Sequence, residues 1–533
     1  MSTEETVASK VRDSPILSCP DELLEKIFDC IDASDLHACQ QTCGVFNDVI
    51  VSSLRLTYKQ ELFADGLREG TRCVLDLANR LEQLREHRRR WLTLGWQQRH
   101  LIRSYEGEPT LLHAHELVGG RFFQGYDRRE MVETILPTPH DQSHQDIAKR
   151  LDFTTKTITA DPSQGLVVIL DFEGRVHLKQ MTTYEPHPLA KEPILPEPIN
   201  GELLVSWLYV AGDLVASFHW TIAPGLSIWN WKTGALVIRD RGSTFPYMPV
   251  RFTFLSSRRF LLSDMQGCGT LRIYVMTDEQ CTATSPISVK NLAPVANLQL
   301  PPLRETWRTF FVSADAPPLP DGVVPGRPFA SIPSEGIVAI SAKYMTADHA
   351  LMSDSFVAFV HMQYLLSISQ PGAATDLCAI PWKEWGPQHT RFMKKPVSDN
   401  AYRWHTCGQR VILPSLTESE IEVLDFNVRP LHLQIAHRPL PSKSDNATNG
   451  TAAGRLASTS ADNTFKIVRT PSTVPAHGLF KEDVVTSLPY VSSTRDFSGS
   501  DTHSYMIDED WLVQLKYTEN DMQTVQSVVA YTF

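Results

Sequence analysis

The sequence predicts a multidomain α + β chain, in which a short helical bundle and its linker helices precede a much larger all-β domain. Apolar residues recur at helical spacing over about the first hundred residues. Beyond them, short β-rich runs alternate with turn residues, as in all-β domains. The length of 533 residues also exceeds what one hydrophobic core usually serves. We therefore expect a disordered tail at 1–14, the bundle at 15–60, linker helices at 61–109 and the all-β domain at 110–533.

Amino-acid composition limits which kinds of partner the protein binds and which cellular compartment it occupies. A hydrophobic content of 42% and a charged content of 21% are typical of a soluble folded protein. The net charge of −11 disfavours bulk binding of nucleic acid, which requires a basic face. No apolar run reaches the roughly 18 to 20 residues that cross a bilayer, and the first residues lack the apolar core of a signal peptide. Nine scattered cysteines fit reduced thiols, so we expect a cytoplasmic or nuclear location and no nucleic-acid or membrane partner.

The helical bundle lies within Cys19 to Leu54 and carries more apolar surface than it can bury alone. Pro20 suits a first helical position, and Ser34 is a candidate N-cap for a second helix. The first helix has one wide apolar stripe, formed by Leu23, Leu24, Ile27, Phe28 and Ile31. About 35 residues are fewer than the roughly 40 that usually fold alone, so the bundle either leans on the rest of the chain or binds another protein.

The order of these residues resembles the F-box, the motif that docks substrate receptors onto the adaptor subunit of an SCF-type ubiquitin ligase. The positions that carry the resemblance are Cys19-Pro20, Leu23-Leu24, Ile27-Phe28, Leu36, and Cys43 with Phe46. Two positions depart from the pattern: Cys19 replaces a leading leucine, and Gly44 stands where a basic residue often follows the cysteine. Cysteine is a small hydrophobe, so the first change weakens a contact without reversing its character.

The resemblance implies adaptor binding by a defined set of residues. That set is Pro20, Leu23, Leu24, Ile27, Phe28, Leu36, Cys39, Cys43 and Phe46. The run from Arg80 to Trp96 is similar to a segment that follows the F-box in many fungal F-box proteins. Its arginines could suggest a phosphate site, but without interleaved aromatic residues we interpret them as a solvated helix face.

The all-β domain is too long for one sandwich or barrel and fits a propeller. Predicted strands of five to seven residues include Leu166 to Asp171, Arg175 to Lys179 and Leu214 to Trp220. The run from Leu226 to Gly234, with Trp229-Asn230 and a Thr-Gly turn, resembles the third strand of a WD-type blade. Because the Gly-His pair that opens such repeats is missing, we expect a degenerate propeller of seven blades, with six as the alternative.

Seven blades of roughly 40 to 45 residues need about 300 residues and leave about 120 for insertions. Three Pro-, Gly- or Ser-rich stretches could hold this surplus: Glu185 to Ile199, Asp315 to Pro333, and a stretch near 439–463 that we expect to be disordered. Propellers often close by pairing an N-terminal strand with the last blade. We expect Glu116 to Phe123 to supply that strand beside Val525 to Phe533.

Candidate chemical sites are weak in this sequence. Cys39 and Cys43, with His37 and Cys30 nearby, could suggest zinc, but their helical spacing favours core packing. His405 and Cys407, with Cys378 and His389, lack paired ligand spacing. The acidic triplet Asp508 to Asp510 is interpreted as a turn before a strand rather than a glycosidase pair. We therefore expect no metal, no cofactor and no catalytic residue.

The prediction for function is a non-catalytic substrate receptor of an SCF-type ubiquitin ligase, with an unknown protein client bound by the β-domain. One alternative is a propeller-based hydrolase or carbohydrate-binding domain with a helical cap. Another is an F-box scaffold that works outside ubiquitin transfer. Trp382, Trp385, Arg403 and Trp404 could form a client-binding patch, although aromatic packing between blades is the simpler interpretation.

Overall fold

A computed structural model describes residues 15–105, 110–111, 114–126, 129–138, 143–196, 205–220, 223–283, 285–347, 353–370, 379–394, 406–413, 420–430, 463–496, 503–518 and 521–533. The chain divides into two compact units. Unit 1 comprises Met1–Arg89, Pro325–Ala330 and Val428–Thr451, and unit 2 comprises Arg90–Val324, Ser331–Asn427 and Ala452–Phe533. The predicted insertion near 439–463 falls almost wholly outside the described residues, and the predicted tail at 1–14 lies wholly outside them.

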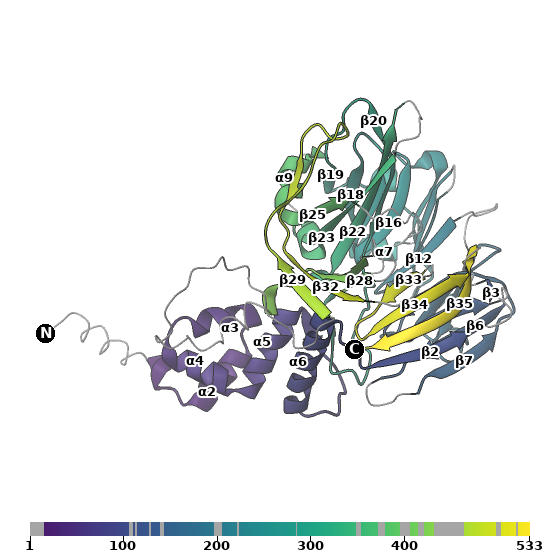
Figure 1. The fold of residues 1–533 in the computed structure, drawn as a ribbon. Coiled ribbons are helices and arrows are strands. Elements are labelled where there is room, and N and C mark those ends of the chain that lie inside the picture. Colours follow the sequence, from purple (N-terminus) through teal and green to yellow (C-terminus); the bar gives the residue numbers. More distant parts are fainter. Residues whose placement is uncertain are drawn as a thin grey trace. The chain divides into compact units, whose positions relative to one another are not determined.

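Unit 1 is mostly helical, and its helices are the purple and dark blue ribbons in Figure 1. They are η1 (Pro15–Ser18), α2 (Asp21–Asp29), α3 (Ala33–Gln40), α4 (Gly44–Ser52), α5 (Leu54–Asp65), β1 (Leu67–Glu69) and most of α6 (Leu77–Thr93). Pro20 is the N-cap of α2 rather than its first helical residue, and Asp32 rather than Ser34 is the N-cap of α3. Both differences are within the range by which helix ends are usually assigned.

Helices α2 to α5 close around one small hydrophobic core. Its buried members are Leu24, Phe28, Leu36, Val49, Ile50 and Leu56. Polar contacts hold α5 to α2: Ser53 accepts a hydrogen bond from the Leu56 N–H and donates one to Glu25. The Lys59 ammonium donates to the carbonyls of Asp29 and Ile31 at 2.6 and 2.7 Å, so it satisfies acceptors that are left over where α2 ends.

A second core joins α5 and α6 within unit 1. It contains Tyr58, Leu62, Leu67, Leu81, Leu84 and Phe329. Here Phe329 comes from the distant segment Pro325–Ala330, and Gly70 donates to the Pro328 carbonyl at 2.8 Å. Strand β1 pairs with β21 (Phe329–Ser331), of which Phe329 and Ala330 belong to this unit.

The basic residues of α6 form the predicted solvated face only in part: the Arg85 and Arg89 side chains are 54% and 61% exposed, whereas Arg88 is 11% exposed. The Arg88 guanidinium contacts Glu61 at 2.6 Å and Asp65 at 2.8 Å, and Arg85 also contacts Glu61. Burial alone would raise the pKa of Glu61, but the attraction of Arg88 and Arg85 outweighs it and lowers that pKa. These charges therefore fasten α6 to α5. The sequence analysis did not predict these ion pairs, because the carboxylates belong to α5 and lie more than 20 positions before the arginines.

Unit 2 is a seven-bladed β-propeller. Among the residues that the structure describes, seven sheets of four or five strands follow one another along the chain. Blade 1 is β4 (Ala114–Val118), β5 (Arg121–Tyr126), β6 (Glu130–Ile135) and β7 (Gln145–Arg150). Blade 2 is β8 (Thr155–Asp161), β9 (Leu166–Asp171), β10 (Arg175–Gln180) and β11 (Ile194–Pro196). Blade 3 is β12 (Val205–Ala211), β13 (Leu214–Trp220), β14 (Gly225–Asn230) and β15 (Ala235–Arg241).

Blades 4 to 6 carry the long insertions. Blade 4 is β16 (Pro249–Ser256), β17 (Arg259–Asp264), β18 (Thr270–Val275) and β19 (Ala296–Gln299), with β24 (Ala379–Ile380) parallel to β19 at its edge. Blade 5 is β20 (Trp307–Asp315), β22 (Ile337–Thr346), β23 (Ser353–His361) and β25 (Thr390–Lys394). Blade 6 is β26 (Thr406–Cys407), β27 (Arg410–Leu413), β28 (Glu420–Asp425), β32 (Tyr490–Asp496) and β29 (Asn463–Val468).

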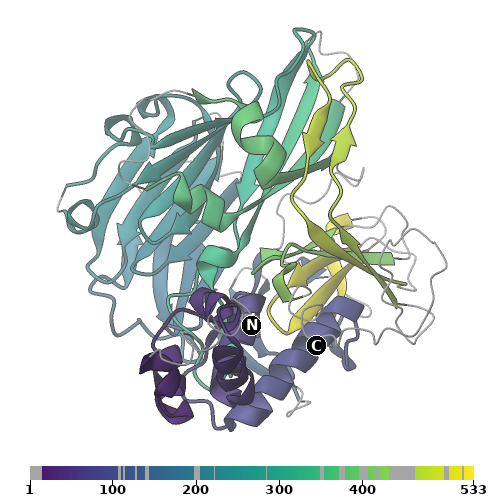
Figure 2. The same cartoon turned by 90° about the vertical axis from the view of Figure 1, so that its left-hand side faces the viewer.

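Short helices and a hairpin lie between these strands. They are η2 (Gly242–Thr244), α7 (Asp278–Thr282), η3 (Val289–Asn291), η4 (Pro333–Glu335), α8 (Met362–Ser367), α9 (Trp382–His389), β30 (Ser472–Val474) and β31 (Val484–Thr486). The yellow-green hairpin β30–β31 runs beside blade 5 in Figure 2, and its neighbours Leu479 and Phe480 join the core between blades 4 and 5. Trp382 and Trp385 are buried in the same core, so the predicted blade-packing role is confirmed for these two. Arg403 and Trp404 lie outside the described residues.

Blade 7 closes the ring with strands from both ends of the unit. It is β33 (His503–Ile507), β34 (Trp511–Thr518), β35 (Asp521–Thr532) and β2 (Gln98–Ser104), and the short β3 (Thr110–Leu111) also pairs with β35. Figure 1 shows the dark blue β2 beside the yellow β35. The predicted closing strand, Glu116 to Phe123, was wrong: it spans β4 and β5 of blade 1. The partner, Val525 to Phe533, was right, and the linker predicted as helical at 61–109 contains β2.

Hydrophobic cores between successive blades show that the ring is complete. One apolar cluster lies between each pair of neighbours from blades 1 and 2 through to blades 6 and 7. A further cluster joins blade 7 back to blade 1 and includes Leu117, Phe122, Trp511 and Val528. The predicted propeller is thus confirmed, with seven blades rather than six. No helix among the described residues is long and apolar enough to cross a membrane.

Candidate functional site

Helix α2 has two adjacent apolar faces with opposite exposure. Leu24 and Phe28, four residues apart, are 0% and 3% exposed and form the centre of the bundle core. Leu23 and Ile27, also four residues apart, are 49% and 44% exposed. The wide stripe of the sequence is therefore divided: one half holds unit 1 together, and the other half is open to a partner.

The other residues predicted to bind an adaptor fall into the same two groups. Leu36 is buried in the core, where Cys39 and Phe46 also pack at its edge. The Phe46 ring meets Phe28 edge to face at 5.1 Å. Pro20 is exposed, and Cys43 is partly exposed at the N-cap of α4. Adaptor binding by this set stays a prediction, in which Pro20, Leu23 and Ile27 are free to make direct contacts and Leu24, Phe28 and Leu36 shape the surface.

Further exposed apolar side chains of unit 1 were missing from the predicted set. They include Ile16, Val45, Val51 and Leu54, which come from η1, α4 and the start of α5. The signal was available in Gly44–Ser52, where five of nine residues are apolar and cannot all face one core.

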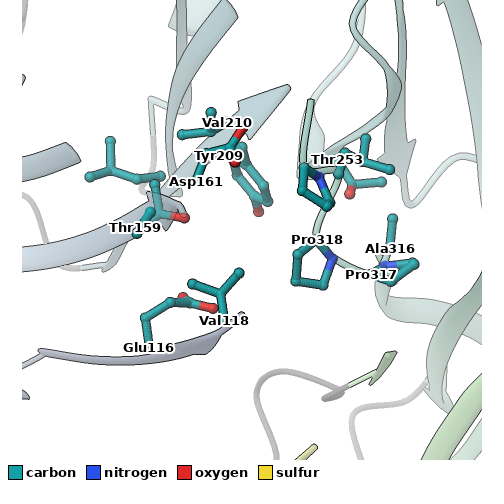
Figure 3. A pocket seen from close by; sticks show the side chains of 14 residues that line it. Glu116, Val118, Thr159, Asp161, Tyr209, Val210, Thr253, Ala316, Pro317 and Pro318 are labelled. Carbon is teal, nitrogen blue, oxygen red and sulfur yellow. The ribbon is translucent and has the colours of Figure 1, made fainter. Parts of the chain in front are cut away.

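The central channel of unit 2 holds a small cavity. Its walls come from the inner strands of blades 1 to 4 and from the segment that follows β20. We call residues 316–324 the channel strap. Figure 3 shows Val118, Thr159 and Tyr209 on one side of the cavity and the strap residues Pro317 and Pro318 on the other. The volume of this cavity is about 40 Å³, far below the roughly 300 to 1,000 Å³ of ordinary ligand pockets.

Two carboxylates line this cavity, but Asp161 is fully engaged in holding the strap. Its Oδ1 accepts from the N–H and hydroxyl of Ser163, and its Oδ2 accepts from Gln164 at 2.9 Å and from the Asp321 N–H at 3.2 Å. Glu116 is the second carboxylate and is buried. A carboxylate with four donors around it is a structural anchor, so the pair does not favour the hydrolase alternative.

The other residues that the sequence offered as catalytic or metal-binding candidates make structural contacts or lie outside the described residues. Asp508 accepts from the N–H groups of Gly120 and Glu509, and its own N–H donates to the Trp511 carbonyl. The turn predicted there is confirmed, and it ties blade 7 to blade 1. Cys378 and His405 lie outside the described residues, and within those residues no three His, Cys, Asp or Glu side chains cluster as metal ligands would.

A comparison with protein-family models finds one match to the start of the chain. The F-box-like model matches residues 16–59, which span the helices α2 to α4 and the first half of α5. Residues 16–59 are an F-box-like domain. The exposed pair Leu23 and Ile27 lies within it, as do all nine residues predicted to bind an adaptor. The fungal origin suggested by the linker stays a prediction.

Solved structures similar to the chain include propellers. The WD40 domain of coronin from Toxoplasma gondii is 10% identical, with a TM-score of 0.36, and the match covers 82% of this chain and 85% of that one. The β-propeller domain of Cps50 (Swd1) from Myceliophteria thermophila is 9% identical, with a TM-score of 0.39, and the match covers 82% of this chain and 100% of that one. No curated protein matches the sequence. With such low scores, the fold assignment rests on the seven sheets themselves.

An F-box-like domain followed by a propeller fits an SCF substrate receptor in general. F-box-like domains suggest binding to the SCF adaptor subunit, and propellers suggest protein binding. The same combination is typical of non-catalytic adaptor proteins.

Proposed function

We propose that this protein is the substrate-recognition subunit of an SCF-type ubiquitin ligase and acts in the cytoplasm or nucleus. The F-box-like domain would dock onto the adaptor subunit, and the propeller would hold a protein client near the enzyme that transfers ubiquitin. Catalysis would then come from proximity, because tethering raises the effective concentration of a client lysine.

The observation that carries this proposal is the exposed pair Leu23 and Ile27 within residues 16–59. Isolated apolar side chains on a surface need no explanation, but a pair at helical spacing beside a packed core forms a binding stripe. Complete burial of a large apolar side chain contributes about 1.5 to 3 kcal/mol. Because these two are about half exposed, each can still contribute roughly 1 kcal/mol by burial.

The test measures adaptor affinity of the purified full chain carrying Leu23→Asp and Ile27→Asp. A charge in a buried interface leaves an unpaired carboxylate, so we expect the affinity in titration calorimetry to fall by about a hundredfold or more. Val74→Asp is the matched control: Val74 is 98% exposed in unit 1 but lies outside the F-box-like domain. Unchanged affinity of the double variant, with a folded circular dichroism spectrum, would contradict adaptor docking by α2.

Reconstituted ubiquitylation separates the receptor from a scaffold outside ubiquitin transfer. A chain that binds the adaptor and is assembled with the remaining ligase subunits should support transfer of ubiquitin to a bound client. Binding without any transfer would favour the scaffold.

A further inference from the structure

Four of the eight large exposed apolar side chains in the described part of unit 2 share one end of the propeller. In blades 1 to 5, each run of four antiparallel strands returns the chain to the end where it began, so the inner strands of these blades all start at the same end. We call this the start end. Four large exposed apolar residues of the described part of unit 2 lie there: Phe172 in the β9–β10 turn, Val205 at the beginning of β12, Met248 just before β16, and Phe310 near the beginning of β20.

The opposite end is covered by the channel strap. The strap leaves β20 at its last residue, and it contacts the turns that follow the inner strands of blades 2 and 3. Gly322 donates to Ser163 at 2.9 Å, and Leu319 forms a parallel bridge with Ala211. A partner of the channel region therefore finds the start end accessible and the other end occupied by this chain.

The backbone at the start end places an aromatic side chain in an unusual position. The pairing of β20 with β22 shifts register between Thr309 and Phe311, so Phe310 is an extra residue in a β-bulge, and it is 51% exposed. Bulges bend a strand and redirect side chains, often beside functional sites. Next to it, the Phe311 ring meets Trp220 of blade 3 edge to face at 6.4 Å. Blades 3 and 5 are not neighbours, so this contact reaches past blade 4 at the start end, where β13 finishes and β20 begins.

Unsatisfied polar groups accompany these rings. His219 is 2% exposed, and neither ring nitrogen has a hydrogen-bond partner in the described part of the chain; the same holds for the Ser206 hydroxyl and the Trp220 indole N–H. Ser206 and His219 face each other across β12 and β13. The Trp220 side chain packs toward blade 4, whereas Ser206 and His219 alternate onto the opposite face of the sheet, toward blade 2 and Lys156. Buried polar groups are normally paired, so unpaired Ser206 and His219 near the start end are candidates for polar contacts that a ligand completes.

The charge around the orphans is positive. Burial, together with the nearby charges of Arg241 and Lys156, lowers the pKa of His219 to about 4. Lys156 lies 5.9 Å from the centre of the exposed Phe172 ring, and Arg308 on β20 donates to the neutral Ala347 carbonyl. Burial lowers the pKa of Lys156 to about 8, which still leaves it largely protonated near pH 7. A carboxylate would be attracted to this position, whereas a cation would be repelled.

We propose that the start end of blades 2 to 5 is the client-binding face and that it takes an extended peptide segment with large apolar side chains beside an Asp or Glu. The apolar side chains would pack on Phe172 and Phe310, and the carboxylate would lie near Lys156 and the orphaned donors. The inference rests on the proposed receptor function, since it names the chemistry of the client segment.

A phage-displayed library of random peptides, selected on the full chain, tests this face with a defined probe. We expect enrichment of peptides that combine Phe, Trp, Leu or Ile with Asp or Glu. Fluorescence anisotropy with the synthetic peptides should show an affinity loss of about tenfold or more for Phe310→Ser and for Phe172→Ser. Lys156→Glu should weaken acidic peptides and leave their Asn or Gln versions almost unaffected.

Matched controls separate this face from other apolar surface and from the adaptor site. Leu189→Ser alters an equally exposed residue in the β10–β11 loop, which His187 ties to the β8–β9 turn at the opposite end, and it should leave peptide binding unchanged. The Leu23→Asp, Ile27→Asp chain should lose the adaptor and keep the peptides. A library that yields no binder, enrichment of basic peptides, or equal binding by the Phe310 and Phe172 variants would overturn the proposal, even where adaptor docking holds.

Discussion

The two units solve the problem of burying apolar residues in different ways. The propeller closes on itself, so each blade packs on two neighbours through seven cores that form an unbroken ring. The four helices around Leu24 and Phe28 have one core of six buried residues and leave Leu23 and Ile27 outside it. A small helical domain has too little interior for all its apolar side chains, and the surplus becomes a binding surface.

The largest expected effect comes from breaking the ring. Deleting 525–533 removes Val525, Val528, Val529, Ala530, Tyr531 and Phe533 from the two cores that flank blade 7. Their burial contributes about 10 kcal/mol, which is comparable to the whole stability of a domain of about 5 to 15 kcal/mol. We expect the truncated chain to lose the cooperative thermal transition of the propeller in calorimetry.

Leu101→Ser is the control for this deletion, because Leu101 lies on the closing strand β2 but is exposed. Its cost should stay within about 0.5 kcal/mol. A truncated chain that melts at the temperature of the intact chain would show that closure does not depend on β35.

A medium effect distinguishes the two faces of α2. Leu24→Ala removes a fully buried side chain and should destabilise unit 1 by about 3 kcal/mol, whereas Leu23→Ala should cost about 0.5 kcal/mol or less. Hydrogen-exchange mass spectrometry of α2 peptides measures both changes locally. Equal loss of protection in the two variants would mean that α2 does not have one buried and one open face.

The smallest effect concerns the charges that join α5 to α6. The pKa of Glu61 is below its usual value of 4.5 in the folded chain, so its stabilisation is present above about pH 4.5 and is lost as the pH falls through the lowered pKa. Glu61→Gln should cost about 1 to 2 kcal/mol at neutral pH and progressively less in acid. Urea unfolding across that pH range measures the difference. Exposed Glu82→Gln is the control, and a gap that widens in acid would contradict the assignment.

Short-range sequence patterns were enough to predict much of this fold. The F-box-like helices follow from residues adjacent in sequence, and strands such as β9, β10 and β13 begin and end within one residue of their predicted bounds. Apolar alternation and turn residues act over a few positions, which is why these elements could be predicted. The residues of the adaptor set were also placed in the matched domain.

Features that depend on distant partners could not be predicted in the same way. Nothing in the run Gln98–Ser104 indicates that it pairs with β35, because its register is set by residues more than 400 positions away. The split between Leu23 and Leu24 depends on Val49 and Leu56, which the helical period of α2 does not include. The Pro-rich stretch after β20 was seen as surplus length, but its role as the channel strap depends on Asp161 and Ser163.

The composition of blade 7 also has a consequence for synthesis of the protein on the ribosome. Strand β2 emerges early, but its partner β35 is completed only at Thr532, so the blades made before it stay in an open ring until the last strand has emerged. Exposed blade edges in that interval invite aggregation, and chaperones would be needed most at this stage. The F-box-like domain at residues 16–59 emerges long before, and its core needs no later segment. Under the proposed function, the chain can therefore bind the adaptor before it holds a client.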